Sequence, residues 1–169
     1  MLRGQRYARQ SLKPNTEILF SRANKEWEHR KLRCAFRLFL SGARAGDPGA
    51  QVNLGYFYDT GIGMKPNRRQ ALYWYKRAFQ QGCAAAATNI GTIFRDQRQL
   101  KKALVWFRRA VKLGDGDANL EIAKIYLRDE GEAGRAIPYL RRTIQARAAA
   151  VTDGSRREAR RLLEQYKKK

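Results

Sequence analysis

Residues 53–82 read NLGYFYDTGIGMKPNRRQALYWYKRAFQQG, and the rest of the chain repeats this pattern. The first part recurs without gaps, in AQVNLGYFY at 50–58, AATNIGTIF at 86–94 and ANLEIAKIY at 118–126. The second part recurs in ALYWYKRA at 71–78, ALVWFRRA at 103–110 and AIPYLRRT at 136–143. Successive copies lie 32 to 36 residues apart. A period of this length predicts an array of stacked supersecondary units.

Each copy has the spacing of an amphipathic helix, as in Leu54, Phe57 and Tyr58. A degenerate earlier copy of the second segment lies in CAFRLFLSGA at 34–43. A glycine at which a helix would end follows this copy and the next two, at Gly46, Gly82 and Gly114, and Arg147 stands at that place after the fourth. Each repeat is therefore predicted to be a helix A, a loop, a helix B and a turn. Small residues let the two helices approach, and aromatic residues fill the gaps. Because a lone helical pair cannot bury its apolar face, we expect an all-α solenoid that forms a right-handed superhelix.

The stretch from 53 to 82 resembles a Sel1-like repeat, a relative of the tetratricopeptide repeat. The resemblance lies in the Gly61-Ile62-Gly63 loop, the helix at 71–78 and the closing Gly82. The next loop, between Phe94 and Ala103, is shorter, lacks glycine and is similar to a tetratricopeptide loop. The resemblance extends over about residues 35–145. It implies an α-solenoid of about three and a half repeats that serves as an adaptor or scaffold for other proteins.

The chain ends are less regular, and their boundaries are predicted from the pattern alone. Residues 25–44 are expected to form one long helix of an incomplete first repeat, and 16–22 a possible short helix before it. Ser155 and Glu158 have the spacing of a helix-capping box. The predicted division is a partly mobile basic segment 1–24, repeats near 25–46, 48–82, 84–114 and 116–147, a capping helix 155–166 and a basic tail 167–169.

Composition argues for a binding protein. The chain of 169 residues has 36 Lys and Arg against 15 Asp and Glu, a net charge of +21 and a pI near 10.7. It has no apolar stretch of membrane-spanning length and no signal-peptide core, so a cytoplasmic location is predicted. Residues 1–16 are basic and free of acids, which also fits a targeting segment.

Cys34 and Cys83 are expected to be buried free thiols in a reducing compartment.

Candidates for catalysis are weak. The glycines between Thr60 and Lys65 lack the strand and the GxxxxGK[ST] spacing of a phosphate-binding loop. His29 is the sole histidine and has no ligand-type neighbour at metal-binding spacing. The acids near Asp115 are expected at a helix start, where the helix dipole favours negative charge. The chain is predicted to be non-enzymatic, with no metal and no cofactor.

Two sets of residues are candidates for partner binding. One is a basic ladder at matching positions of successive B helices, formed by Lys76, Arg77, Arg108, Arg109, Arg141 and Arg142. The other would line an A-helix groove and comprises Asn53, Tyr56, Asp59, Asn89, Thr92, Arg95, Glu121, Lys124 and Arg128. In tetratricopeptide relatives an asparagine at the positions of Asn53 and Asn89 holds the backbone of a bound peptide, although Glu121 interrupts such a row here.

The predicted partner of a monomeric chain is an acidic protein or peptide, drawn to the positive charge. The alternative is nucleic acid, because a basic domain with a pI above about 9 has the electrostatic signature of phosphate-backbone binding. An anionic membrane surface is a third possibility. The small size also fits a bacterial immunity or accessory protein for one cognate effector, although no particular residue indicates it.

Overall fold

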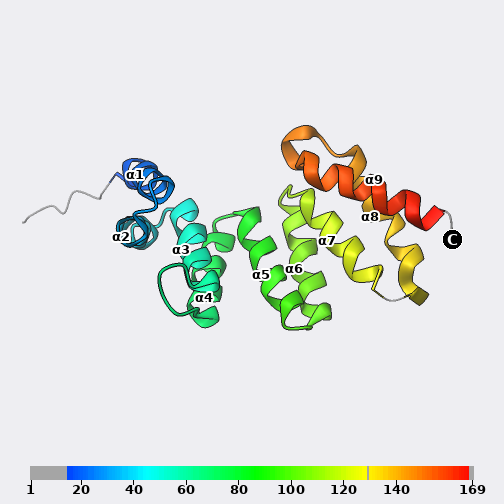
Figure 1. Ribbon diagram of the computed structural model, residues 1–169, viewed down its shortest axis with the longest axis horizontal. Helices are drawn as coiled ribbons and strands as arrows, with labels where there is room; N and C mark the ends of the chain where they lie inside the picture. The colour runs from blue at the N-terminus through cyan, green and yellow to red at the C-terminus, as the bar shows by residue number, and fades with distance from the viewer. Residues whose placement is uncertain (1–14, 129, 168–169) are drawn as a thin grey trace, which may run out of the picture.

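A computed structural model describes residues 15–128 and 130–167 (Figure 1). The regular secondary structure of this part of the chain is entirely helical. Antiparallel helical hairpins follow one another in a row from the N-terminus to the C-terminus, which gives an elongated solenoid (Figure 1). The A helices are α1 (Thr16–Glu28), α3 (Pro48–Thr60), α5 (Ala84–Asp96) and α7 (Asp117–Tyr126). The B helices are α2 (Leu32–Arg44), α4 (Arg68–Gln80), α6 (Leu100–Lys112) and α8 (Ile137–Gln145).

Two short 3-10 helices and a final α-helix complete the array. The segment η1 (Glu130–Arg135) joins α7 to α8, and η2 (Ala148–Ala150) precedes α9 (Asp153–Lys167). Helix α9 packs against α8 and also contacts α7, so it covers the last hairpin as the A helix of a further repeat would. The C-terminal helix therefore caps the solenoid, as the sequence predicted.

Local sequence sets where the helices begin and end. Side-chain oxygens of Asn15, Asp47 and Asn67 accept backbone N–H groups in the first turns of α1, α3 and α4. Gly46, Gly82 and Gly114 lie just beyond B helices with φ of +102°, +84° and +95°. Side chains rarely adopt this left-handed conformation, and glycine does so without strain. The predicted glycine stops are therefore confirmed.

The two helices of a hairpin meet where a glycine faces a ring. A Cβ added to Gly55 of α3 would lie 2.6 Å from the ring of Tyr75 of α4. A Cβ added to Gly91 of α5 would lie 2.7 Å from the ring of Phe107 of α6. Tyr75 and Phe107 are fully buried. In both hairpins, the ring occupies the space that a side chain on the facing helix would need.

The fourth hairpin has a different pair at the same two positions. Ala123 replaces the glycine, and Leu140 replaces the aromatic residue, and both belong to one buried cluster. The extra methyl group on α7 is matched by a smaller side chain on α8. Total volume is thus conserved across the helix pair, which is how close-packed interiors tolerate substitution.

The N-terminal prediction of one helix over 25–44 is wrong. The chain folds there into two helices, α1 and α2, which pack against each other. Arg30 lies in the turn between them at φ +57°, a left-handed conformation in a residue other than glycine. Residues 16–24 belong to α1, so the helical array begins before the predicted boundary at 25. The described residues contain four hairpins and α9, where about three and a half repeats were predicted.

Two smaller expectations also need correction. Helix α9 begins at Asp153, with Thr152 as its cap: the Thr152 hydroxyl accepts the N–H of Ser155 at 3.2 Å. Ser155 is therefore the third residue of the helix and is not its cap.

Cys34 is exposed and Cys83 is half-buried, and both are free thiols. Position 34 falls on the outer side of α2, so the expectation of two buried thiols is wrong. Residues 1–14 and 168–169 lie outside the described residues.

The glycine–ring contact predicts a specific rescue. We expect Gly91→Ala to destabilise the fold, because its methyl group would collide with Phe107. Overpacking costs about 1–3 kcal/mol, and better helix propensity returns about 1 kcal/mol. The double variant Gly91→Ala with Phe107→Leu reproduces the Ala123–Leu140 pair and should regain most of the loss. Thermal unfolding followed by circular dichroism measures both effects. An unchanged or raised Tm for Gly91→Ala would contradict this packing.

Candidate partner-binding surfaces

The predicted groove residues fall on the A helices, and we call the face that they form the A-helix surface. Asn53, Tyr56 and Asp59 lie on α3, and Asn89, Thr92 and Arg95 lie on α5. Glu121 and Lys124 lie on α7, whereas Arg128 follows the end of that helix and is exposed. Most of these side chains are half-buried, and Tyr56, the one aromatic residue among them, is 41% exposed.

The N-terminal half of the A-helix surface is polar and aromatic. The Asn53 side-chain amide donates to the Asn24 oxygen of α1 at 3.4 Å. Tyr56 stacks on Trp27 of α1, with ring centroids 5.8 Å apart. Sequence reasoning missed Asn24 because it placed the helix boundary after that residue. The only sequence signal for the correct register is Ala23, which lies 32 residues before Gly55 and is likewise small.

The C-terminal half of the A-helix surface is joined by ion pairs within the chain. Arg95 pairs with Glu121 and, at 3.0 Å, with Asp96. Lys124 pairs with Glu121 at 3.2 Å and with Glu158 of α9 at 2.9 Å. Three predicted groove residues thus come together, and their charges are neutralised by one another. A partner's carboxylate would have to displace these acids to reach Arg95 or Lys124.

Asp59 stands apart from this network. Burial raises the pKa of the Asp59 carboxyl above its ordinary value, since a low-dielectric surrounding disfavours the charged form. The positive charge of Arg68 opposes this rise, and the negative charge of Asp96 adds to it. Burial also raises the pKa of the nearby Tyr75 hydroxyl, with Asp59 as a further cause.

The raised pKa of Asp59 predicts a pH-dependent stability change. The folded chain binds a proton at Asp59 more tightly than the unfolded chain does. Ionised Asp59 therefore opposes folding at neutral pH, and this penalty is lost as the pH falls through the folded pKa. We expect Asp59→Asn to raise the Tm at neutral pH and to leave it unchanged near about pH 3, where both states are protonated. Glu164→Gln, at an exposed residue of α9, is the control. A lower Tm for Asp59→Asn at neutral pH would contradict this account.

On the B helices, one row of the basic ladder covers aromatic rings. The guanidinium groups of Arg77, Arg109 and Arg142 lie 5.7, 4.4 and 5.4 Å from the ring centroids of the aromatic residues three positions earlier. Those residues are Trp74, Trp106 and Tyr139. Cation–π attraction at such distances stabilises each guanidinium group at the surface without neutralising its charge. The repeat period thus places arginines in equivalent positions on successive helices.

The other row of the ladder is formed by Lys76, Arg108 and Arg141, all exposed. Arg108 donates to the hydroxyl of Tyr126, on the following A helix, at 2.8 Å. Within the part of the chain that the structure describes, the side chains of Lys76 and Arg141 form no hydrogen bond or ion pair, so they are free to meet a partner. The ladder residues therefore differ in how strongly the fold holds them.

Charge is segregated between the two kinds of helix. The B helices contain no acid at all and carry three Lys or Arg residues on α2, four on α4, five on α6 and two on α8. The A helices α1, α3, α5 and α7 carry seven acidic and four basic residues. Among the described residues, no ion pair involves a cation of any B helix. The uncompensated positive charge of the repeats is thus concentrated on the B helices, which we call the B-helix face.

Residues that could support other chemistry stay apart. Over 15–128 and 130–167, no three His, Cys, Asp or Glu side chains gather in a way that could hold a metal ion. His29 lies at the end of α1 and is exposed. In the same part of the chain, no helix has both the length and the hydropathy needed to cross a membrane.

The successive helical hairpins, with a glycine in the turn after three of the B helices, define an α-solenoid of the kind used as an interaction scaffold. The Sel1 repeat family model matches residues 48–83 and 85–115, which contain the second and third hairpins. The second and third hairpins thus match the Sel1 repeat. Proteins built from these repeats are typically non-catalytic adaptors that bind other proteins.

Individual relatives agree with this assignment. The putative Sel1-like repeat-containing protein L21 of Acanthamoeba polyphaga mimivirus is 28% identical over 86 residues, which are 51% of this chain and 16% of the viral protein. The crystal structure of a Sel1 repeat protein from Oxalobacter formigenes superposes with a TM-score of 0.62 at 27% identity, and the match covers 79% of this chain and 59% of that one. This chain therefore spans only part of both relatives.

A more distant structure shares the fold alone. The crystal structure of MamA superposes with a TM-score of 0.59 at 16% identity, over 92% of this chain and 82% of that one. The whole array, including the first and fourth hairpins that the family model does not match, is thus similar in arrangement to a known helical-repeat solenoid.

Proposed function

We propose that this chain is a non-enzymatic, monomeric adaptor that binds an acidic protein or peptide in the cytoplasm. The B-helix face provides the main contact, through the ladder Lys76, Arg77, Arg108, Arg109, Arg141 and Arg142. The single observation that carries the proposal is the charge segregation: every B helix carries cations and no acid, and none of these cations forms an ion pair within residues 15–128 and 130–167.

Unpaired surface cations favour an acidic partner for a physical reason. Arginine forms two parallel hydrogen bonds with a carboxylate, and like-charged rows accelerate the encounter with an opposite charge. Each cation that already has an internal acid, such as Arg95, contributes less to a new partner. The A-helix surface then has a secondary role, in which Asn53, Asn89 and Tyr56 contact the backbone or side chains of the bound segment.

Nucleic acid is the weaker alternative. Binding of single strands normally uses exposed aromatic rings on which bases stack. The aromatic rings of the ladder are covered by their own arginines, and Trp74 is only 6% exposed. Exposed Tyr73 remains beside Arg77, with the Arg77 guanidinium 6.0 Å from its ring centroid. Tyr73 is the one exposed aromatic residue of the B helices, and a single ring is too little for a platform on which successive bases stack.

A charge-reversal experiment tests the proposal on the two ladder residues that the fold does not use. We expect the tagged chain to retain one protein stoichiometrically from a nuclease-treated extract of its own cells in moderate salt. Lys76→Glu with Arg141→Glu should reduce the amount retained by at least tenfold. The matched control, Arg157→Glu with Arg160→Glu on α9, makes the same change in net charge at exposed residues and should retain the protein.

Two outcomes contradict the proposal. One is a signal that disappears on nuclease treatment, with an affinity for duplex DNA that falls with a log–log salt slope of about 0.9 per phosphate contacted. The other is an equal loss in the ladder and α9 variants, because then only total charge matters. Circular dichroism of both double variants verifies that the helices are intact.

A further inference from the structure

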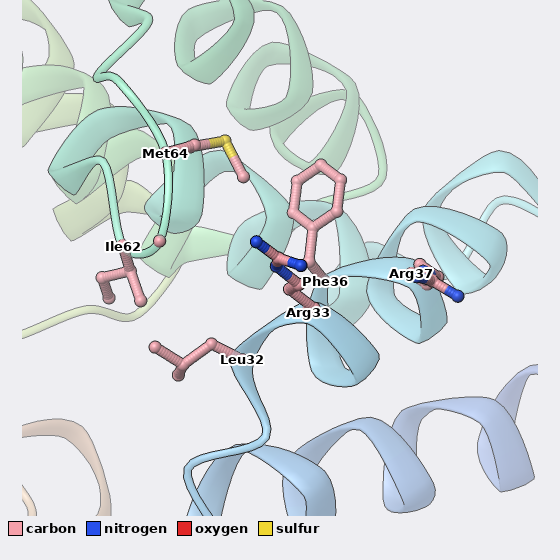
Figure 2. Close-up of a pocket in the computed structure, with 7 residues that line it drawn as sticks. Leu32, Arg33, Phe36, Arg37, Ile62 and Met64 are labelled. Carbon is pink, nitrogen blue, oxygen red and sulfur yellow. The ribbon is translucent and has the colours of Figure 1, made fainter.

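A small apolar cavity lies at the edge of the B-helix face, between the start of α2 and the loop that joins α3 to α4 (Figure 2). Its volume is about 250 Å³. The pockets that hold drug-sized ligands are larger, about 300–1,000 Å³. The cavity has room for one or two side chains. It is lined by Leu32, Arg33, Phe36, Arg37, Ile62, Gly63 and Met64.

The loop side of the cavity is held in shape by two glycines and local hydrogen bonds. Gly61 and Gly63 have φ of +72° and +71°. The N–H of Met64 donates to the Gly61 carbonyl at 3.1 Å, and the N–H of Asn67 donates to the Tyr58 carbonyl at 2.6 Å. A Cβ on Gly61 would lie 2.6 Å from the Pro66 ring. The loop therefore presents the side chains of Ile62 and Met64, one on either side of Gly63, toward α2 (Figure 2).

The helix side of the cavity is equally fixed. Phe36 makes edge contacts with Phe57 and Tyr58 of α3, at ring-centroid distances of 5.9 and 5.7 Å. Leu32 and Phe36 are one helical turn apart and both are half-buried. The apolar lining thus exists before any partner arrives, so no reorganisation is needed to fill it.

Two unpaired arginines flank this apolar lining. Arg33 and Arg37 are exposed, lie one turn apart on α2, and form no ion pair with any acid of the described residues. Figure 2 shows the guanidinium group of Arg33 extending toward the space between Phe36 and the loop, with Arg37 further along the helix. The site therefore combines an apolar hollow with donors suited to carboxylates.

We propose that this cavity receives one or two adjacent apolar side chains of an acidic segment of the partner, whose flanking carboxylates pair with Arg33 and Arg37. This inference rests on the proposed function and adds the feature by which the partner is recognised. Nucleic acid has no aliphatic or benzyl side chain to fill such a hollow. A second copy of this chain, at +21, is repelled by the same arginines.

The chain offers a direct reporter for this site, because it contains only two methionines and Met64 lines the cavity. Carbon-13 labelling of the methionine methyl groups gives two signals, and a Met64→Leu variant assigns them. The probe is a fluorescein-labelled oligoglutamate peptide with a central Leu-Phe pair. Its matched control has Ser-Ser at the centre and the same charge.

We expect the Leu-Phe peptide to shift the Met64 methyl signal and to leave the Met1 signal in place. We also expect it to bind about tenfold more tightly than the Ser-Ser peptide, the ratio that burial of one large apolar side chain gives. Ile62→Ser should remove this preference, whereas Ile18→Ser, at an exposed isoleucine of α1, should preserve it.

The outcomes separate this inference from the proposed function. If both peptides bind equally and the Met64 signal stays in place, the cavity is not the recognition site, and the basic adaptor remains. If neither peptide binds in moderate salt, both proposals fail. If the Leu-Phe peptide is preferred but Ile62→Ser leaves its advantage unchanged, the apolar contact is elsewhere and the inference is overturned.

Discussion

The structure depends on the close approach of helices within a hairpin, which requires a missing or minimal side chain on helix A. At Gly55 and Gly91 a facing ring occupies the volume that a Cβ would take. This contact fixes the separation and rotation of the two helices together. Once the rotation is fixed, the remaining apolar residues of each helix must face the core, and the polar ones must face solvent. The surface pattern is therefore a consequence of the packing.

The charge segregation follows from that rotation. Lys76, Arg77 and their equivalents are exposed, whereas Tyr75 and Phe107, which face the glycines of helix A, are buried. Stacked hairpins repeat this placement, so cations that are adjacent in one helix become rows along the solenoid. The A helices instead carry most of the acids of the hairpins, and their charges pair with one another across α5, α7 and α9. The C-terminal half of the A-helix surface is thus neutralised internally, while the B-helix face keeps its charge.

Much of the array could be predicted from sequence, because its signals are local and periodic. The period gave the hairpins from α3 to α8, and the glycines marked where B helices end. The first hairpin could not be found in this way. Its turn uses Arg30 at φ +57°, and another left-handed arginine, Arg98, joins α5 to α6. Neither residue carries the turn signal of a glycine, and in the first hairpin only Ala23 preserves the repeat pattern of helix A.

The candidate sites were predictable only in part, for a similar reason. Sequence spacing placed the ladder residues and the A-helix residues on the correct helices. It could not foresee that Arg95 pairs with Glu121 of the next A helix, or that Glu158 reaches Lys124 from a helix outside the repeats. Nor could it foresee the cavity at Phe36, which needs the loop after α3 to fold against α2. Contacts between different repeats carry no periodic signal.

The central claim is that an acidic partner covers the B-helix face, and arginine footprinting of the purified complex tests it most directly. Phenylglyoxal modification followed by mass spectrometry reports the reactivity of each arginine with and without the partner. The account predicts strong protection of Arg77, Arg109 and Arg141, with Arg157 and Arg160 on α9 unchanged. Protection confined to Arg95 and Arg128 on the A-helix surface, with the ladder still reactive, would contradict it.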